Sequence, residues 1–130
     1  MISSIRLDGT TACMTILGAT DTEVFRAYVA RVLCPTLRHG DIVIMDNLAP
    51  HKSDPTLALI AQAGAQVLFL PAYSPDFNPI EKMWSKVKAS LRSAEARTPA
   101  ELIPAIGAAL AKVTPQDARH WFVSCGYSFI

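Results

Sequence analysis

The chain has 130 residues and a net charge of +1, and 51% of its residues are hydrophobic and 18% charged. These values allow one domain with a packed core and exclude an intrinsically disordered protein. No apolar run approaches the roughly 18 residues of a membrane span, and no signal-peptide pattern is evident. The three cysteines lack the spacing of a zinc site or a disulfide framework, so we expect a cytoplasmic protein.

The first part of the chain predicts a β-hairpin followed by a helix. Residues 2–7 and 11–17 are β-prone, and Asp8-Gly9 between them is a strong signal for a tight turn. Residues 20–33 begin with capping side chains and continue with apolar side chains at helical spacing. These elements form the start of an α/β domain.

Two apolar runs in the middle of the chain predict buried strands. Residues 42–45 and 66–70 lack polar alternation, which is typical of strands that are buried on both faces, as in a parallel sheet. A short helix, residues 55–63 closed by Gly64, separates them. The order strand, helix, strand predicts a right-handed crossover and a parallel pair.

Three later helices are predicted to begin in the same way. Each start has a polar capping residue, then proline, then an acid at the third helical position, as at Asn78-Pro79, Thr98-Pro99 and Thr114-Pro115. Pro104 is expected to bend the second of these helices or to shift its start. The predicted fold class is therefore α/β, a mixed sheet with flanking helices.

Asp46 is the first candidate for chemistry. It follows a predicted parallel strand, and ligands gather outside the carboxyl ends of strands in open α/β sheets. Asp46-Asn47 is also ordinary turn chemistry, so this position alone leaves a purely structural interpretation open.

Glu81 has a competing explanation, because a third-position acid can cap its own helix. It differs from the other such acids because it shares a helix face with Ser85, Lys88 and Arg92, and its loop can return toward Asp46. Two neighbouring carboxylates repel each other unless a cation intervenes, and Mg²⁺ prefers carboxylate oxygens.

A local excess of positive charge follows Glu81. Residues 82–97 contain five lysines and arginines against one acid. Such an excess can contact phosphate, although a solvated helix face is the alternative interpretation.

A longer pattern joins these candidates. It consists of Asp46-Asn47-Leu48-Ala49-Pro50-His51-Lys52 and, later, Tyr73-Ser74-Pro75-Asp76-Phe77-Asn78-Pro79-Ile80-Glu81, with 34 residues between the two acids. In these motifs the chain resembles DDE transposases, in particular the bacterial insertion-sequence branch of the mariner superfamily. The resemblance implies an RNase H-like catalytic domain over residues 1–130, metal-dependent DNA strand cleavage and strand transfer, and a bacterial protein that is at the nucleoid when bound to DNA.

The resemblance also assigns residues. Asp46 corresponds to the second catalytic acid and Glu81 to the third, and both are expected to bind Mg²⁺, with Mn²⁺ as the alternative ion. The implied DNA partners are transposon ends and target DNA. The residues that we expect to contact DNA are Asn47, His51, Lys52, Lys88 and Arg92.

The chain departs from the family pattern at its front. Family members carry the first catalytic aspartate on a central strand before the hairpin, and a helix-turn-helix region before that. Here Met1 lies at the hairpin, and Asp8 in the turn is a poor substitute. We therefore expect a truncated domain, inactive alone, that forms a homo-oligomer or assembles with the missing amino-terminal part. The alternative is a non-catalytic remnant or interaction module that associates with a full-length transposase through open strand edges.

Overall fold

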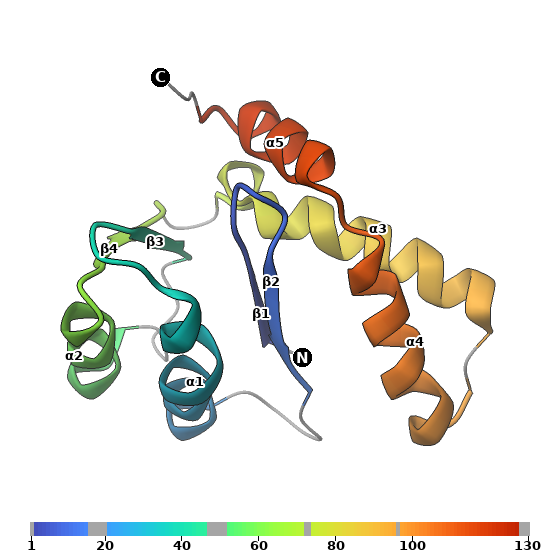
Figure 1. Cartoon of the computed structure of the whole chain (residues 1–130), viewed down its shortest axis with the longest axis horizontal. Coiled ribbons are helices and arrows are strands. Elements are labelled where there is room, and N and C mark those ends of the chain that lie inside the picture. The colour runs from blue at the N-terminus through green and yellow to red at the C-terminus, as the bar shows by residue number, and fades with distance from the viewer. Residues whose placement is uncertain (1, 16–20, 47–51, 72–73, 96, 128–130) are drawn as a thin grey trace. The chain divides into compact units, whose positions relative to one another are not determined.

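The chain folds as an α/β protein with helices and two small sheets, which confirms the predicted class at this level (Figure 1). The structure, a computed structural model, describes residues 2–15, 21–46, 52–71, 74–95 and 97–127. The elements are β1 (Ile2–Ile5), β2 (Thr11–Met14), α1 (Thr22–Tyr28), the π-helical η1 (Val29–Leu33), the 3₁₀ turn η2 (Cys34–Thr36), β3 (Ile42–Met45), α2 (Asp54–Gln62), β4 (Gln66–Phe69), the 3₁₀ turn η4 (Pro75–Phe77), α3 (Pro79–Ala94), α4 (Pro99–Ala111) and α5 (Pro115–Ser124). No helix among the described residues is long and apolar enough to cross a membrane.

Internal contacts divide the chain into two compact units. The first unit comprises residues 1–4 and 12–78, and the second comprises residues 5–11 and 79–130. Asp46 therefore belongs to the first unit and Glu81 to the second. Each unit is described by itself.

The first unit is built on the predicted parallel pair. β3 pairs with β4 in parallel, with Ile42 opposite Gln66 and Met45 opposite Phe69. The pairing extends beyond the strands, since the Leu70 amide donates to the carbonyl of Met45 over 2.7 Å. The intervening helix α2 supplies the crossover, so the strand-helix-strand prediction is confirmed.

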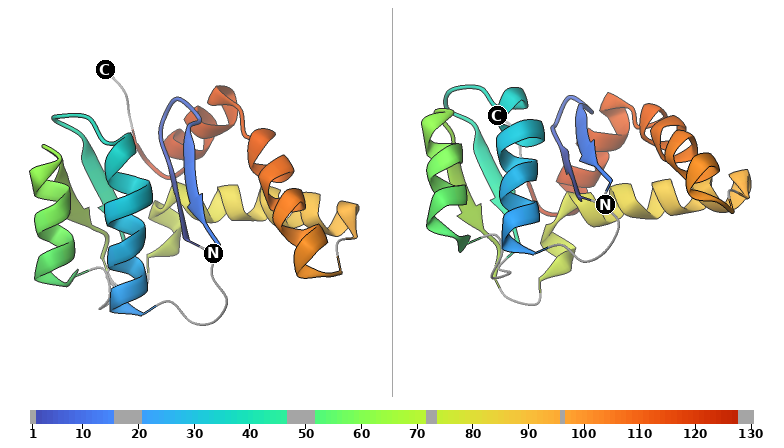
Figure 2. Two further views of the ribbon diagram at one scale, coloured as in Figure 1. Left: turned by 60° about the horizontal axis from the view of Figure 1, so that its bottom comes forward. Right: turned by 90° about the horizontal axis from the view of Figure 1, so that it is seen from below.

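Helices cover one face of this parallel pair (Figures 1 and 2). The buried core of the unit joins the two helical segments α1–η1 and α2 to the strands. Its buried members are Phe25, Tyr28, Val29, Leu33, Met45, Ile60 and Ala65, and Val43, Val67 and Phe69 pack against them. Alternate strand residues thus contribute one side of the sheet to the core.

The prediction that both faces of these strands are buried is wrong. Ile42 is 61% exposed and Leu68 is 53% exposed. Their side chains alternate with those of the core-facing residues, so they lie on the opposite face of the pair. The apolar runs therefore predict the two strands correctly, but they do not predict whether the second face of the sheet is covered.

The hairpin and the parallel pair form separate two-stranded sheets rather than a single mixed sheet. A turn joins β1 to β2, in which the Arg6 amide donates to the carbonyl of Thr10 over 2.9 Å. Within the first unit, the buried Tyr28 hydroxyl donates to the carbonyl of Ala12 over 2.8 Å, which ties α1 to β2. Burial raises the pKa of Tyr28 to about 12. No strand among the described residues pairs with both sheets.

Helix starts in both units follow the predicted capping chemistry. The Asp21 carboxylate accepts from the amide of Val24 over 2.8 Å at the start of α1. Thr98 and Thr114 cap α4 and α5 through their hydroxyl groups. α4 begins at the predicted residue and continues through Pro104, so the expected shift of its start does not occur.

The second unit packs α3 against α4 and α5. Its core consists of Met83 and Val87 from α3 with Ala109 and Val113, and Trp84 and Trp121 are half-buried beside it. The residues of α3 that enter this core are spaced by four, which makes one stripe along the helix. This stripe fixes which face of α3 turns inward.

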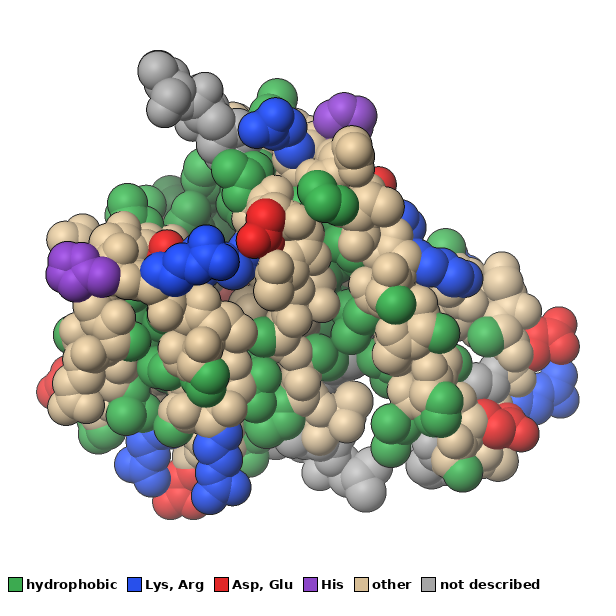
Figure 3. Space-filling model, in the orientation of Figure 1, with side chains coloured by type: hydrophobic (Ala, Val, Ile, Leu, Met, Phe, Trp, Pro, Cys, Tyr) green, Lys and Arg blue, Asp and Glu red, His purple; other side chains and the backbone are tan. Residues whose placement is uncertain are grey.

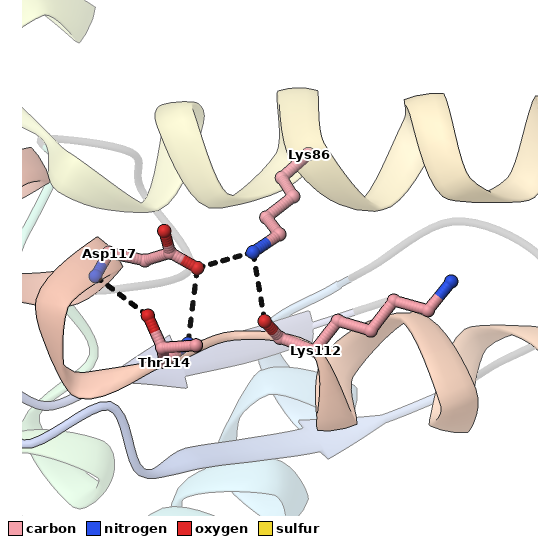
Figure 4. Close-up of polar contacts among 4 residues, drawn as sticks. All are labelled: Lys86, Lys112, Thr114 and Asp117. Atoms are coloured by element: carbon pink, nitrogen blue, oxygen red, sulfur yellow. Dashed lines mark hydrogen bonds and ion pairs between the residues drawn. The ribbon is translucent and has the colours of Figure 1, made fainter.

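A polar junction joins the three helices of the second unit (Figure 4). Lys86 of α3 donates to the carbonyl of Lys112 over 2.8 Å and forms an ion pair with Asp117. Lys112 in turn donates to the hydroxyl of Ser90 over 3.2 Å. Asp117 and Thr114 form the capping box of α5, and the hydrogen bonds from Lys86 and from the Thr114 backbone lower the pKa of Asp117.

The hairpin turn approaches the same junction from within the second unit. Gly9 has φ +89°, and a Cβ atom placed on it would lie 2.9 Å from the nitrogen of Pro115. Glycine is therefore required here both by backbone conformation and by space.

We predict that Gly9→Ala lowers the free energy of unfolding by about 1–3 kcal/mol, because it adds backbone strain and a contact with residues 114–115. Urea unfolding followed by circular dichroism measures this effect. Gly126→Ala is the matched control, since Gly126 has φ +96° and open space around it. Equal losses in the two variants would contradict the close approach of the turn.

Candidate functional site

Asp46 directly follows β3, at the carboxyl end of the parallel pair. Met45 is the last residue of β3 and accepts the amide of Leu70, so the backbone before Asp46 is fixed by β4. Asp46 is half-buried, and its Oδ1 atom is buried. The structure thus places this carboxylate at the edge where the sequence predicted it, within the first unit.

Lys52 lies at the same edge of the first unit. Its Nζ atom is 6.0 Å from the centroid of the Phe69 ring, and Phe69 is the last residue of β4 and is paired with Met45. This is the outer limit of a cation–π contact and leaves the ammonium group exposed. Asn47 and His51, the other predicted members of this motif, lie outside the described residues.

Glu81 lies on the first turn of α3, as predicted, but does not act as a helix cap. The corresponding acids of α4 and α5 do: Glu101 accepts from the amide of Arg97 over 2.9 Å, and Asp117 accepts from the amide of Thr114 over 3.1 Å. The exposed carboxylate of Glu81 makes no hydrogen bond or ion pair within the described parts of the chain. The structural explanation that applies to the other two acids therefore does not apply to Glu81.

The face of α3 that carries Glu81 also carries Ser85, Lys88 and Arg92. All four are exposed, and the Ser85 hydroxyl donates to the Glu81 carbonyl over 3.3 Å. Lys88 and Arg92 make no hydrogen bond or ion pair with any described residue. Both cations are therefore available to an external anion.

The predicted basic segment divides between two faces of α3. Lys86 is engaged in the junction with α4 and α5, away from the face of Glu81. Lys82 lies one turn before Lys86 on that second face. On the one face drawn in Figure 3, the described lysines and arginines lie scattered.

Comparison with known protein families decides the class. Residues 1–103 match the DDE superfamily endonucleases. The chain belongs to this superfamily. The match covers both predicted acids and the motifs around them, and members of the superfamily generally use divalent metal ions.

A local similarity to a known protein adds a second finding. The chain is 45% identical over 42 residues to the human histone-lysine N-methyltransferase SETMAR. The aligned stretch is 32% of this chain and 6% of SETMAR. The chain therefore spans only a small part of that protein.

The donor chemistry of this member of the DDE endonuclease superfamily suits a divalent ion. Both candidate acids supply hard carboxylate oxygens, which Mg²⁺ and Mn²⁺ prefer. Within the described residues, no cluster of three or more histidine, cysteine, aspartate or glutamate side chains could hold a metal ion by itself.

Sequence patterns do not predict the junction between Lys86, Lys112 and Asp117. Lys86 was interpreted as part of the basic segment and Asp117 only as a capping acid. The two residues are 31 positions apart, and no spacing rule relates them. The capping pattern at Thr114-Pro115 predicts where the side chain of Asp117 lies, near the start of α5, but it does not predict that Lys86 contacts it.

We predict that Glu81→Ala changes the free energy of unfolding by less than about 0.5 kcal/mol, because no folded-state contact of the carboxylate is lost. Glu101→Ala is the matched comparison and should cost about 0.5–2 kcal/mol, since it removes a backbone hydrogen bond at a helix start. Urea unfolding of the two variants measures the difference. A loss for Glu81→Ala as large as that for Glu101→Ala would mean that Glu81 has a structural role.

Proposed function

We propose that the chain is part of the catalytic domain of a DDE transposase that cleaves DNA strands and transfers them in a metal-dependent reaction. The observation that carries the proposal is that the Glu81 carboxylate, on the first turn of α3, has no partner among the residues that the structure describes. Asp46 at the carboxyl edge of β3 and β4 supports it. The family match over residues 1–103 includes both acids.

Asp46 and Glu81 act in this proposal as ligands and not as general bases. Each supplies carboxylate oxygens from a fixed element, the end of β3 or the first turn of α3. Divalent ions held there would lower the pKa of an attacking water and stabilise the leaving oxygen of a DNA phosphodiester. The freed 3′ hydroxyl would then attack target DNA in the strand-transfer step.

An RNase H-like architecture is the fold that we propose for the complete domain. The hairpin β1–β2 and the parallel pair β3–β4 would be joined by a central strand that carries the first acid. Assembly with an amino-terminal part would supply this strand, and a homo-oligomer of the chain is the alternative assembly that we propose. Mg²⁺ is the proposed ion and Mn²⁺ the alternative.

DNA binding is proposed along the Glu81 face of α3 and at Lys52. Lys88 and Arg92 follow Glu81 by seven and eleven positions, which corresponds to about 10 and 16 Å along a helix. A phosphate backbone that enters at the metal could thus meet both cations. Transposon ends and target DNA are the proposed partners, and Asn47 and His51 remain predicted contacts.

A non-catalytic interaction module is the second candidate. The specific observation in its favour is that β3 pairs on one side only, while Ile42 and Leu68 are exposed on the uncovered face. An open strand edge can take a strand from another polypeptide. In that case the loss of either acid would leave binding to a full-length transposase intact.

We predict that Asp46→Ala and Glu81→Ala each reduce nicking of supercoiled plasmid to background in Mg²⁺ or Mn²⁺, because each removes a metal ligand. The assay uses the chain alone and the chain combined with an amino-terminal segment that carries the first acid. Glu101→Gln is the control, because it keeps a third-position side chain that can cap α4. Nicking that persists in both alanine variants at the level of the control would overturn the proposal.

We further predict that Lys88→Ala and Arg92→Ala weaken binding to duplex DNA, each lowering the slope of log affinity against log salt concentration by about 1. Fluorescence anisotropy at several salt concentrations measures both quantities. Lys82→Ala is the control on the other face of the helix. A larger change for Lys82→Ala than for the other two variants would mean that DNA binds the opposite face of α3, which contradicts the proposal.

A further inference from the structure

The junction around Lys86 lies next to the helix that carries Glu81 and mostly outside the superfamily match. Lys112, Thr114 and Asp117 follow residue 103, at which that match ends. They connect the end of α4 to the start of α5. The family resemblance therefore assigns no role to this part of the chain.

Lys86 contacts the ends of two helices at once. Lys112 is the carboxyl-terminal cap of α4, so its carbonyl carries the negative end of that helix dipole. Asp117 is held in place by its capping box with Thr114, so it meets Lys86 in a fixed position. The ammonium group of Lys86 is thereby fixed from two sides (Figure 4).

A second polar tie, meaning a hydrogen bond between α3 and the end of α4, lies one turn further along α3. Lys112 donates back to Ser90, and Ser90 and Lys86 are four residues apart on the same helix face. Two polar ties on one face add a directional restraint on rotation of the helix about its axis to the apolar packing of Met83 and Val87, because hydrogen bonds depend on angle as well as distance.

The main effect of the junction is not a gain in the stability of the protein. The side chains of Lys86 and Asp117 are 36% and 30% exposed, and exposed ion pairs contribute little to stability. Their geometric effect on Glu81 is larger. A rotation of α3 by about 20° would move a carboxylate at the outer radius of the helix by roughly 2 Å, and displacements of about 1 Å can cost 100-fold in a reaction.

We propose that Lys86, held by Lys112 and Asp117, is a positioning residue that refines the rotation of α3 set by its apolar stripe and so orients the Glu81 carboxylate for binding a metal ion. The inference rests on the proposed function, since it takes Glu81 to be a metal ligand. It gives the α4–α5 connection a role in the reaction without any contact with DNA or metal.

Isothermal titration calorimetry with MnCl₂ tests the inference, with the full chain combined with the amino-terminal segment that carries the first acid. Lys86→Met keeps the apolar part of the side chain and removes its hydrogen-bond donors. It is expected to weaken Mn²⁺ binding by about 10-fold, the low end of the loss that follows when residues that orient metal ligands are replaced. Lys86→Arg should restore binding to within about two-fold, because it keeps the charge and the donors. Lys82→Met is the matched control on the same helix face, and it should leave the affinity unchanged.

A double-mutant cycle with Glu81→Gln separates positioning from a general loss of stability. Lys86→Met should weaken Mn²⁺ binding in the unmodified chain and have no effect when Glu81 is already replaced. Ser90→Ala, which removes only the second tie, should weaken binding by a smaller factor, and it serves as the second variant if Lys86→Met does not fold.

The outcomes distinguish this inference from the proposed function. Equal Mn²⁺ affinity in Lys86→Met, Ser90→Ala and the unmodified chain overturns the positioning role alone. If the unmodified chain and Glu81→Gln show the same affinity, or neither binds Mn²⁺, Glu81 is not a ligand, and both the proposed function and this inference are overturned.

Discussion

A carboxylate at the third position of a helix normally turns back to accept an unpaired backbone amide, and this interaction is available to three helices of the chain. Glu101 and Asp117 use it, whereas Glu81 accepts no such bond from any amide that the structure describes. The same local sequence pattern therefore has two structural outcomes in one molecule. An acid that is left without this stabilisation is the feature on which the functional account depends, because it is free to bind a cation.

Local chemistry explains why much of the fold could be predicted from the sequence. Capping residues, the proline starts of α4 and α5 and the closing glycine at Gly64 act over a few positions, and the structure confirms them. The parallel pairing of β3 with β4 followed from a short crossover. The exposure of Ile42 could not be predicted, because hydrophobic pattern reports the strand but not what covers its second face.

The same distinction between local and long-range information applies to the candidate site. The places of Asp46 and Glu81 at the ends of their elements were predicted, because strand ends and helix starts are local features. The partnership of Lys86 with Asp117 was not, because it joins residues 31 positions apart through tertiary packing. The match to the DDE endonuclease superfamily covers both acids, whereas most of the junction lies beyond residue 103, where that match ends.

The central claim is that Asp46 and Glu81 bind the same metal centre, and paramagnetic broadening by Mn²⁺ in ¹H–¹⁵N NMR spectra tests it most directly. The account predicts that amide signals near the end of β3 and on the first turn of α3 broaden together at the same substoichiometric Mn²⁺ concentration. It also predicts that replacement of either acid reduces the broadening at both places. Broadening at one place only, or at two places with unrelated concentration dependence, would contradict the claim.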